Sequence, residues 1–169
     1  MKKSIDFSPL NQKIMKHNEK TAEILNDLIE INNDRVAGYE KASKETGIGD
    51  GDLRTLFSDL ASDSRQYAME LKKHVFAEGE KAASSTDTTL RGKIYRAWMD
   101  VKATFSGHDR KSVLESCEFG EDAAQRAYEA ALKSESDLNA EVATLIREQQ
   151  RKLRASHDQI KALRDRQYA

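Results

Sequence analysis

Apolar residues recur every three to four positions along four long stretches of this 169-residue chain, and that period constrains the fold more than any other feature. The four stripes contain Leu25, Leu28, Ile29, Val36 and Tyr39; Leu53, Phe57, Leu60, Ala61, Ala68, Leu71 and Val75; Leu114, Cys117, Ala124, Tyr128 and Leu132; and Val142, Leu145, Ile146, Leu153, Ile160 and Leu163. Such a stripe is typical of an amphipathic helix that buries one face. Only one Pro and eight Gly interrupt the chain, so the pattern predicts an all-α protein.

The breaks between the stripes indicate how the helices connect. Short polar turns lie near Thr46 and at residues 134–137, and a short loop makes neighbouring helices antiparallel. We therefore expect two helical hairpins, at residues 18–78 and 110–168. The longer connection between them carries a helical stripe of its own, which predicts a crossover helix at residues 88–106.

One long crossover between the second and third helices of a bundle is the ferritin-like arrangement. The sequence therefore predicts a ferritin-like antiparallel four-helix bundle over residues 18–168, with the additional helix in its crossover. Trp98 and Phe105 belong to the stripe of that helix, which should be buried against the bundle or a second subunit. Residues 1–17 are an N-terminal extension that either lengthens the first helix from Ser8 or docks elsewhere.

The charges argue against two classes of partner. Twenty-eight basic and 29 acidic residues are interleaved along the chain and leave a net charge of −1, so no basic patch suggests nucleic acid or anionic lipid. No apolar run approaches the roughly 20 residues that span a membrane. Cys117, the single cysteine, indicates no disulfide and has no histidine partner at catalytic spacing. We expect a cytoplasmic protein.

A polar layer is expected to cross the predicted core at mid-height. On the first three main helices, polar residues stand seven positions from apolar stripe residues, which places them on the buried faces. On the fourth, Gln149 and Gln150 flank the stripe. The layer comprises Asn32, Ser64, Tyr67, Glu121 and Gln150. Di-iron bundles hold their metals at this level, with a Glu from each of two helices and Glu-x-x-His from each of the other two.

The predicted layer has the wrong residues for two irons. The Glu-x-x-His positions hold Ser64 to Tyr67 and Gln150 to Leu153, and Glu121 is the one central carboxylate. A hydrogen-bonded network that fixes helix register therefore fits better than a di-metal site. We predict no catalytic residues and no cofactor. The alternative is one ion of iron or another divalent metal, held by Glu118, Glu121 and His157.

Several segments resemble a known family. They are Asn26 to Asp34, Gly38 to Ala42, Arg96 to Lys102, Gly120 to Asp122 with Ala127-Tyr128, and Ala155 to Asp165. The chain resembles, over about residues 18–166, a bacterial family of ferritin-like four-helix-bundle proteins of unknown function. The resemblance implies the bundle fold and an association with stress responses. It implies no activity, substrate or catalytic residue.

Two functions are compatible with these features. The first is a non-enzymatic bundle with a stress-linked accessory or protein-interaction role, acting as a homo-oligomer or with a protein partner. The second is a ferritin-like redox or iron-storage protein with an atypical site that is poor in carboxylates. The metal content of the purified protein would separate them.

Overall fold

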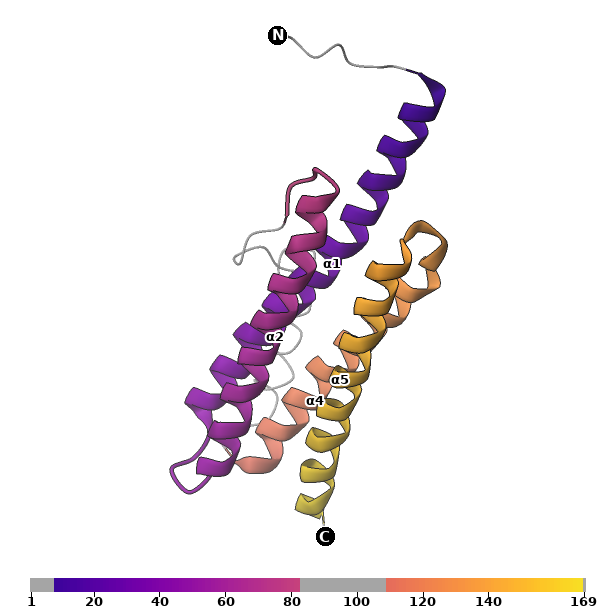
Figure 1. Cartoon of the computed structure of the whole chain (residues 1–169). Coiled ribbons are helices and arrows are strands. Elements are labelled where there is room, and N and C mark those ends of the chain that lie inside the picture. Colours follow the sequence, from indigo (N-terminus) through magenta and orange to yellow (C-terminus); the bar gives the residue numbers. More distant parts are fainter. Residues whose placement is uncertain (1–7, 83–108, 169) are drawn as a thin grey trace.

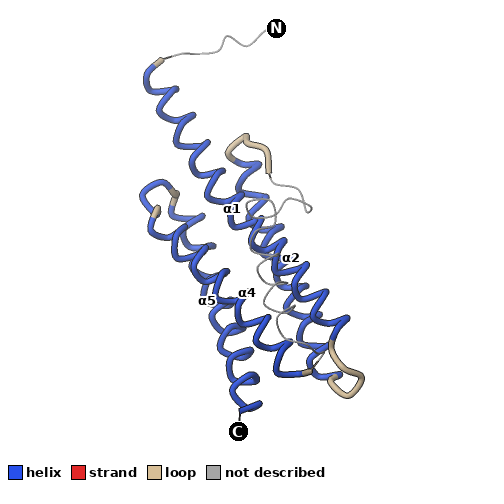
Figure 2. The backbone as a smooth tube through the Cα atoms, turned by 180° about the vertical axis from the view of Figure 1, so that it is seen from behind, coloured by secondary structure: helices blue, strands red, loops and turns tan. Residues whose placement is uncertain are grey.

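The computed structural model describes residues 8–82 and 109–168, and all of its long elements are helices (Figure 1). The elements are α1 (Pro9–Glu45), α2 (Gly51–Ala77), α4 (Arg110–Lys133) and α5 (Ala140–Asp165), with short 3-10 turns η2 (Glu135–Asp137) and η3 (Arg166–Tyr168). The described residues contain no strand, as the tube in Figure 2 also shows. The prediction of an all-α protein is confirmed. The predicted crossover helix at 88–106, with Trp98 and Phe105, lies outside the described residues.

Polar side chains begin three of the four helices. The Ser8 hydroxyl accepts a hydrogen bond from the Asn11 amide at 3.3 Å, immediately before Pro9. Asp109 accepts from the Ser112 amide at 2.8 Å, and Asn139 opens α5 in the same way. Each cap satisfies a backbone N–H that has no partner within its own helix. These starts set where each apolar stripe begins.

The first helix begins before the first predicted hairpin. α1 begins at Pro9 and continues without a break past residue 17, so residues 9–17 lengthen this helix rather than dock elsewhere. This end of α1 projects beyond the neighbouring helices (Figures 1 and 2). Leu10, Ile14 and Met15 are exposed there, with Leu10 at 69%.

The four helices form two hairpins that pack together as a helical bundle. α1 and α2 are neighbours along their length, and so are α4 and α5, while α1 also packs against α4 (Figure 1). Arg110 at the start of α4 reaches Asp50 at 3.0 Å and Asp52 at 2.7 Å, at the start of α2. This contact ties the two hairpins together at one end of the bundle.

The core consists of two apolar clusters with a polar layer between them. One cluster includes Leu25, Leu28, Leu71 and Ile146, and the other includes Tyr39, Phe57, Leu114 and Ile160. On every helix, a buried polar residue lies between the two clusters in sequence: Arg35, Ser64, Glu121 and Ser156. The heptad-like packing therefore places these four side chains at one level of the bundle.

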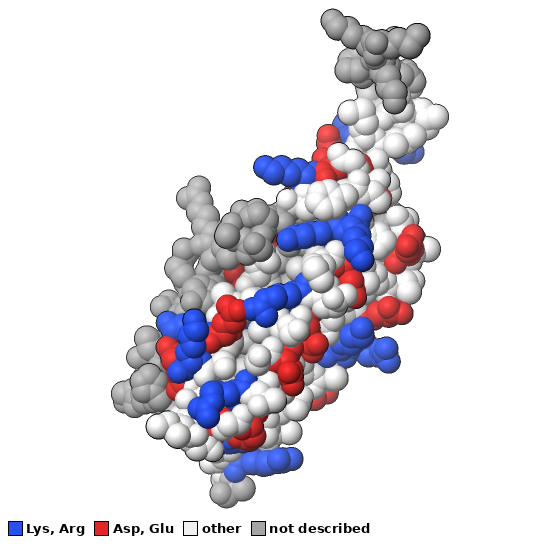
Figure 3. All heavy atoms as spheres, turned by 60° about the vertical axis from the view of Figure 1, so that its left-hand side comes forward, with Lys and Arg blue, Asp and Glu red and all other residues white. Residues whose placement is uncertain are grey.

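Basic and acidic side chains alternate on the exterior face drawn in Figure 3. Ion pairs between exposed residues include Arg65 with Glu40 and Lys161 with Asp165. Among the described residues, no helix has a stretch apolar enough and long enough to cross a membrane.

Candidate functional site

An ion pair between α1 and α4 forms the centre of the polar layer. Arg35 Nη2 donates to Glu121 Oε1 at 2.5 Å, and the two side chains are 1% and 0% exposed. The guanidinium is always charged and carries five N–H donors. Taking both ions out of water costs several kcal/mol per ion, which close contact and further hydrogen bonds must offset. The surrounding residues supply bonds to Arg35 Nη1 and Nη2 and to Glu121 Oε1, whereas Arg35 Nε and Glu121 Oε2 have no hydrogen-bond partner among the described residues.

Hydroxyl groups from α1, α2 and α5 surround the ion pair. Arg35 Nη1 donates to the Ser64 hydroxyl of α2, and Nη2 also reaches the Ser156 hydroxyl of α5 at 3.4 Å. The Tyr39 hydroxyl donates to the same Glu121 oxygen that the guanidinium contacts. The Arg35 guanidinium carbon also lies 5.4 Å from the centre of the Tyr39 ring, within cation–π range. One cation and one carboxylate thus bind side chains from every helix of the bundle.

A second hydrogen-bonded chain lies one turn away. Asn32 Nδ2 donates to the Tyr128 hydroxyl at 2.9 Å, and that hydroxyl donates to Gln149 Oε1 at 2.7 Å. Gln149 Nε2 then donates to Glu70 at 2.9 Å and to the backbone carbonyl of Tyr67 at 3.3 Å. These hydrogen bonds connect α1 to α4, α5 and α2 in turn. A slip of any one helix would break these bonds, so the layer fixes helix register.

The ionisation of the buried groups follows from their surroundings. Burial disfavours the charged form of Arg35, but the charge of Glu121, its hydrogen bond to Arg35 and the nearby Tyr39 and Tyr128 together outweigh that effect and raise the pKa of the guanidinium. Burial, followed by the nearby Glu121 charge, raises the pKa of the Tyr39 hydroxyl well above its ordinary value. Burial also raises the pKa of Tyr128, and that of Tyr67 to about 12. The tyrosines therefore remain neutral donors at physiological pH.

The structure places four of the five predicted layer residues in the core. Asn32, Ser64 and Glu121 are fully buried, and Tyr67 is 6% exposed. Gln150 is only half-buried, and its neighbour Gln149 is the buried glutamine that joins the network. The choice between these adjacent residues depends on the rotation of α5 about its axis. Tyr67 contributes its backbone carbonyl to the network.

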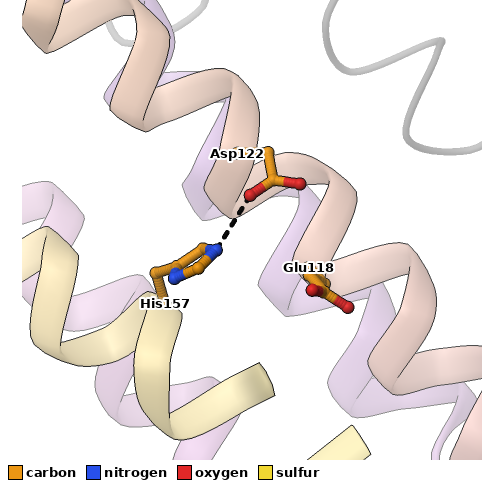
Figure 4. Close-up of side chains that lie close together, drawn as sticks. All are labelled: Glu118, Asp122 and His157. Carbon is orange, nitrogen blue, oxygen red and sulfur yellow. Dashed lines mark hydrogen bonds and ion pairs between the residues drawn. The ribbon is translucent and has the colours of Figure 1, made fainter.

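The three residues predicted as an alternative metal site separate into two groups. Glu121 faces Arg35 in the core, so its carboxylate does not join the other two. Glu118 and His157 do come together near the edge of the bundle, and Asp122 completes the group (Figure 4). Their ligand atoms lie within 4.8 Å of one another, and His157 Nε2 is 2.8 Å from Asp122 Oδ1. The structure therefore groups Glu118 and His157 with Asp122 rather than with Glu121.

A groove of about 590 Å³ lies between α1 and α4. Its walls are mainly apolar, with Leu28 and Ile31 on α1 and Ala127 and Ala131 on α4. Asp27 stands at its rim, where burial and then the negative charge of Glu23 raise the pKa of the carboxyl. The groove presents an apolar strip to whatever covers it.

Comparison with known families gives one match, to the family described as Domain of unknown function (DUF2383), over residues 20–134. That span covers more than half of the chain. The chain belongs to the DUF2383 family. No curated protein matches it. The match includes Arg35, Glu121 and the groove, so the central ion pair of this DUF2383 protein lies within the family domain. Gln149, Ser156 and His157 on α5 lie beyond the matched span.

Arg35 is the functional residue that the sequence reasoning missed in this DUF2383 member. The stripe of the first helix was assigned through Val36, which the structure shows half-buried, while Arg35 beside it is 1% exposed. A signal was present, because Arg35 stands seven residues after Leu28 and seven before Ala42, both buried. A long cationic side chain is ordinarily expected to be exposed to solvent, so this spacing did not lead to a prediction that Arg35 is buried.

Proposed function

We propose that this protein is a non-enzymatic ferritin-like bundle with an accessory or protein-interaction role, in the stress-linked setting that its family resemblance implies. The observation that carries the proposal is the buried pair of Arg35 with Glu121. A fixed guanidinium stands beside the one central carboxylate of the layer. A second cation at that carboxylate would meet the positive charge of Arg35 at close range in a medium of low dielectric.

The ligand chemistry of the layer supports the same conclusion. Di-iron bundles bring about four carboxylates and two imidazoles to this level. Here Glu121 accepts from a guanidinium and a tyrosine hydroxyl, and two serine hydroxyls accept from that guanidinium. Hydroxyl and amide groups satisfy hydrogen bonds, but they do not neutralise two divalent ions. The layer is suited to holding four helices in register.

The first prediction follows for iron chemistry. Purified protein should oxidise Fe²⁺ no faster than buffer alone, because Arg35 already neutralises the core carboxylate. The melting temperature of the His157→Gln variant, which lacks the peripheral cluster, should be the same with and without chelator. The measurement is the absorbance of ferric product, with Glu121→Ala as the comparison variant. A ferroxidase activity that disappears in Glu121→Ala would make Glu121 a metal ligand and refute the proposal.

We also propose that the connection between α2 and α4 is a ferritin-like crossover with a helix at residues 88–106. The apolar stripe of that helix, with Trp98 and Phe105, is buried against the bundle or a second subunit. The apolar groove between α1 and α4 supports this placement, because Asn26 of α1 donates to the Lys81 carbonyl at 3.0 Å, beside Asp27 of the groove.

The second prediction tests this placement. Trp98→Ala should lower the free energy of unfolding of the monomer by about 3–5 kcal/mol, as expected for loss of a buried indole. Met69→Ala, at a side chain that is 53% exposed on α2, is the matched control and should change it by less than about 0.5 kcal/mol. Chemical denaturation measures both. Dissociation of an oligomer with unchanged monomer stability would assign the stripe to a subunit interface instead, and no effect at all would refute its burial.

A further inference from the structure

We propose that Glu118, Asp122 and His157 form a binding site for a single divalent transition-metal ion of the Zn²⁺ class. The site is separate from the polar layer and independent of the function proposed for it. Glu118 and Asp122 stand one turn apart on α4, and His157 faces them from α5 (Figure 4). An imidazole with two carboxylates is a ligand set that Zn²⁺ and similar ions accept.

The geometry of His157 is that of a metal ligand oriented by an outer carboxylate. Its Nδ1 lies 3.1 Å from Asp158 Oδ1, and its Nε2 points toward Asp122 at 2.8 Å. A histidine ligand in proteins ordinarily donates its second ring N–H to a carboxylate, which fixes the tautomer and leaves the other nitrogen free to coordinate. Asp158 fills that role here, and the coordinating nitrogen faces the two α4 carboxylates.

Negative charges outnumber positive charges around the cluster, which favours the binding of a cation. Three carboxylates, from Glu118, Asp122 and Asp158, surround His157, and Arg164 contacts Glu118 at 2.8 Å. A divalent ion would replace the proton that His157 shares with Asp122 and would compete with Arg164 for Glu118. At typical Zn–O and Zn–N lengths of about 2.0–2.2 Å, tetrahedral ligand atoms lie roughly 3.4 Å apart. The ligand atoms of the cluster, which lie within 4.8 Å of one another, must therefore approach by up to roughly 1.4 Å.

The side chains can make that adjustment. The side chain of Asp122 is 46% exposed, so rotation costs it little packing, whereas that of His157 is 17% exposed and is held by its two neighbours. The imidazole of His157 is therefore already held in place, and the carboxylate of Asp122 is the side chain that moves. Solvent can fill the remaining coordination position, as it does in open zinc sites.

Calorimetric titration of tag-free, full-length protein with Zn²⁺ tests the proposal. Wild type should bind one ion per chain, His157→Gln should abolish the binding, and Asp158→Asn should weaken it about 10- to 100-fold through loss of the outer carboxylate. Mg²⁺, which prefers oxygen ligands and retains its water, should not bind here. His17→Gln changes an exposed histidine of α1 outside the cluster and should bind Zn²⁺ as wild type does.

Unfolding curves of each variant establish that the fold is retained. Zn²⁺ binding that is the same in wild type and in correctly folded His157→Gln would refute the site, and so would the absence of binding in wild type. The result is distinguishable from a core metal site, because an ion bound at Glu121 would be insensitive to His157→Gln and lost in Glu121→Ala.

Discussion

Glu121→Ala is expected to lower the free energy of unfolding by about 3–5 kcal/mol, because it leaves the Arg35 guanidinium charged and unpaired in the core. The Tyr39 hydroxyl loses its acceptor in the same variant. Chemical denaturation at neutral pH measures the loss. Glu118→Ala is the matched control: it lies on the same helix and breaks a partly exposed pair with Arg164, and it should cost about 1 kcal/mol or less.

A double replacement separates the charge from the packing. Arg35→Met combined with Glu121→Leu removes both ions while keeping most of their volume, and such replacements of buried pairs are often neutral or stabilising. The double variant should therefore be more stable than either single variant. If Glu121→Ala behaved like Glu118→Ala, or if the double variant were the least stable of the three, the ion pair would not be the central contact of the layer.

The second large effect is expected at alkaline pH. Tyr39 and Tyr128 are fully buried, and burial raises the pKa of each hydroxyl above the value of about 10 that holds in the unfolded chain. Between those two pKa values, the unfolded chain loses a proton that the folded chain retains. Each buried tyrosine therefore makes its full contribution to the free energy of unfolding below about pH 10. Above about pH 10, that free energy falls by about 1.4 kcal/mol per pH unit for each tyrosine.

Tyrosinate absorbance followed through a pH titration measures this effect. The buried tyrosines should ionise only as the helices unfold, in one cooperative step that coincides with the loss of circular dichroism. Tyr39→Phe should make the decline of stability with pH shallower, whereas Tyr168→Phe, at an exposed residue, should not. Ionisation of Tyr39 and Tyr128 near pH 10 with the helices intact would show that these hydroxyls are accessible to solvent.

The helical fold could be read from the sequence because it depends on periodicity and helix ends. The stripes through Leu25, Phe57, Leu114 and Ile146 are buried as expected, and Asp109 caps α4. Such local patterns survive tertiary context when the apolar face is wide and the breakers are clear. The start of α1 was harder to place, because residues 9–17 extend the helix beyond its neighbours and leave their apolar side chains exposed.

The chemistry of the layer could be read only in part. Seven-residue spacing located Asn32, Ser64 and Glu121, but spacing alone does not distinguish Gln149 from Gln150 or Asp122 from Glu121 as the residue that meets His157. These choices depend on helix rotation, which packing against three neighbours sets. Arg35 was missed because a buried cation requires a partner from a distant segment, Glu121, and the sequence does not show that pairing.

Iron stoichiometry tests the central claim most directly, because Arg35 and an iron pair would compete for the same carboxylate. Protein loaded with Fe²⁺ without oxygen and passed through a desalting column is analysed for metal, with His157→Gln measured alongside it to remove the peripheral cluster. Because Arg35 neutralises the core carboxylate, we predict less than one iron per chain in the wild type and essentially none in His157→Gln. Two irons retained per chain in both proteins, and lost in Glu121→Ala, would contradict it.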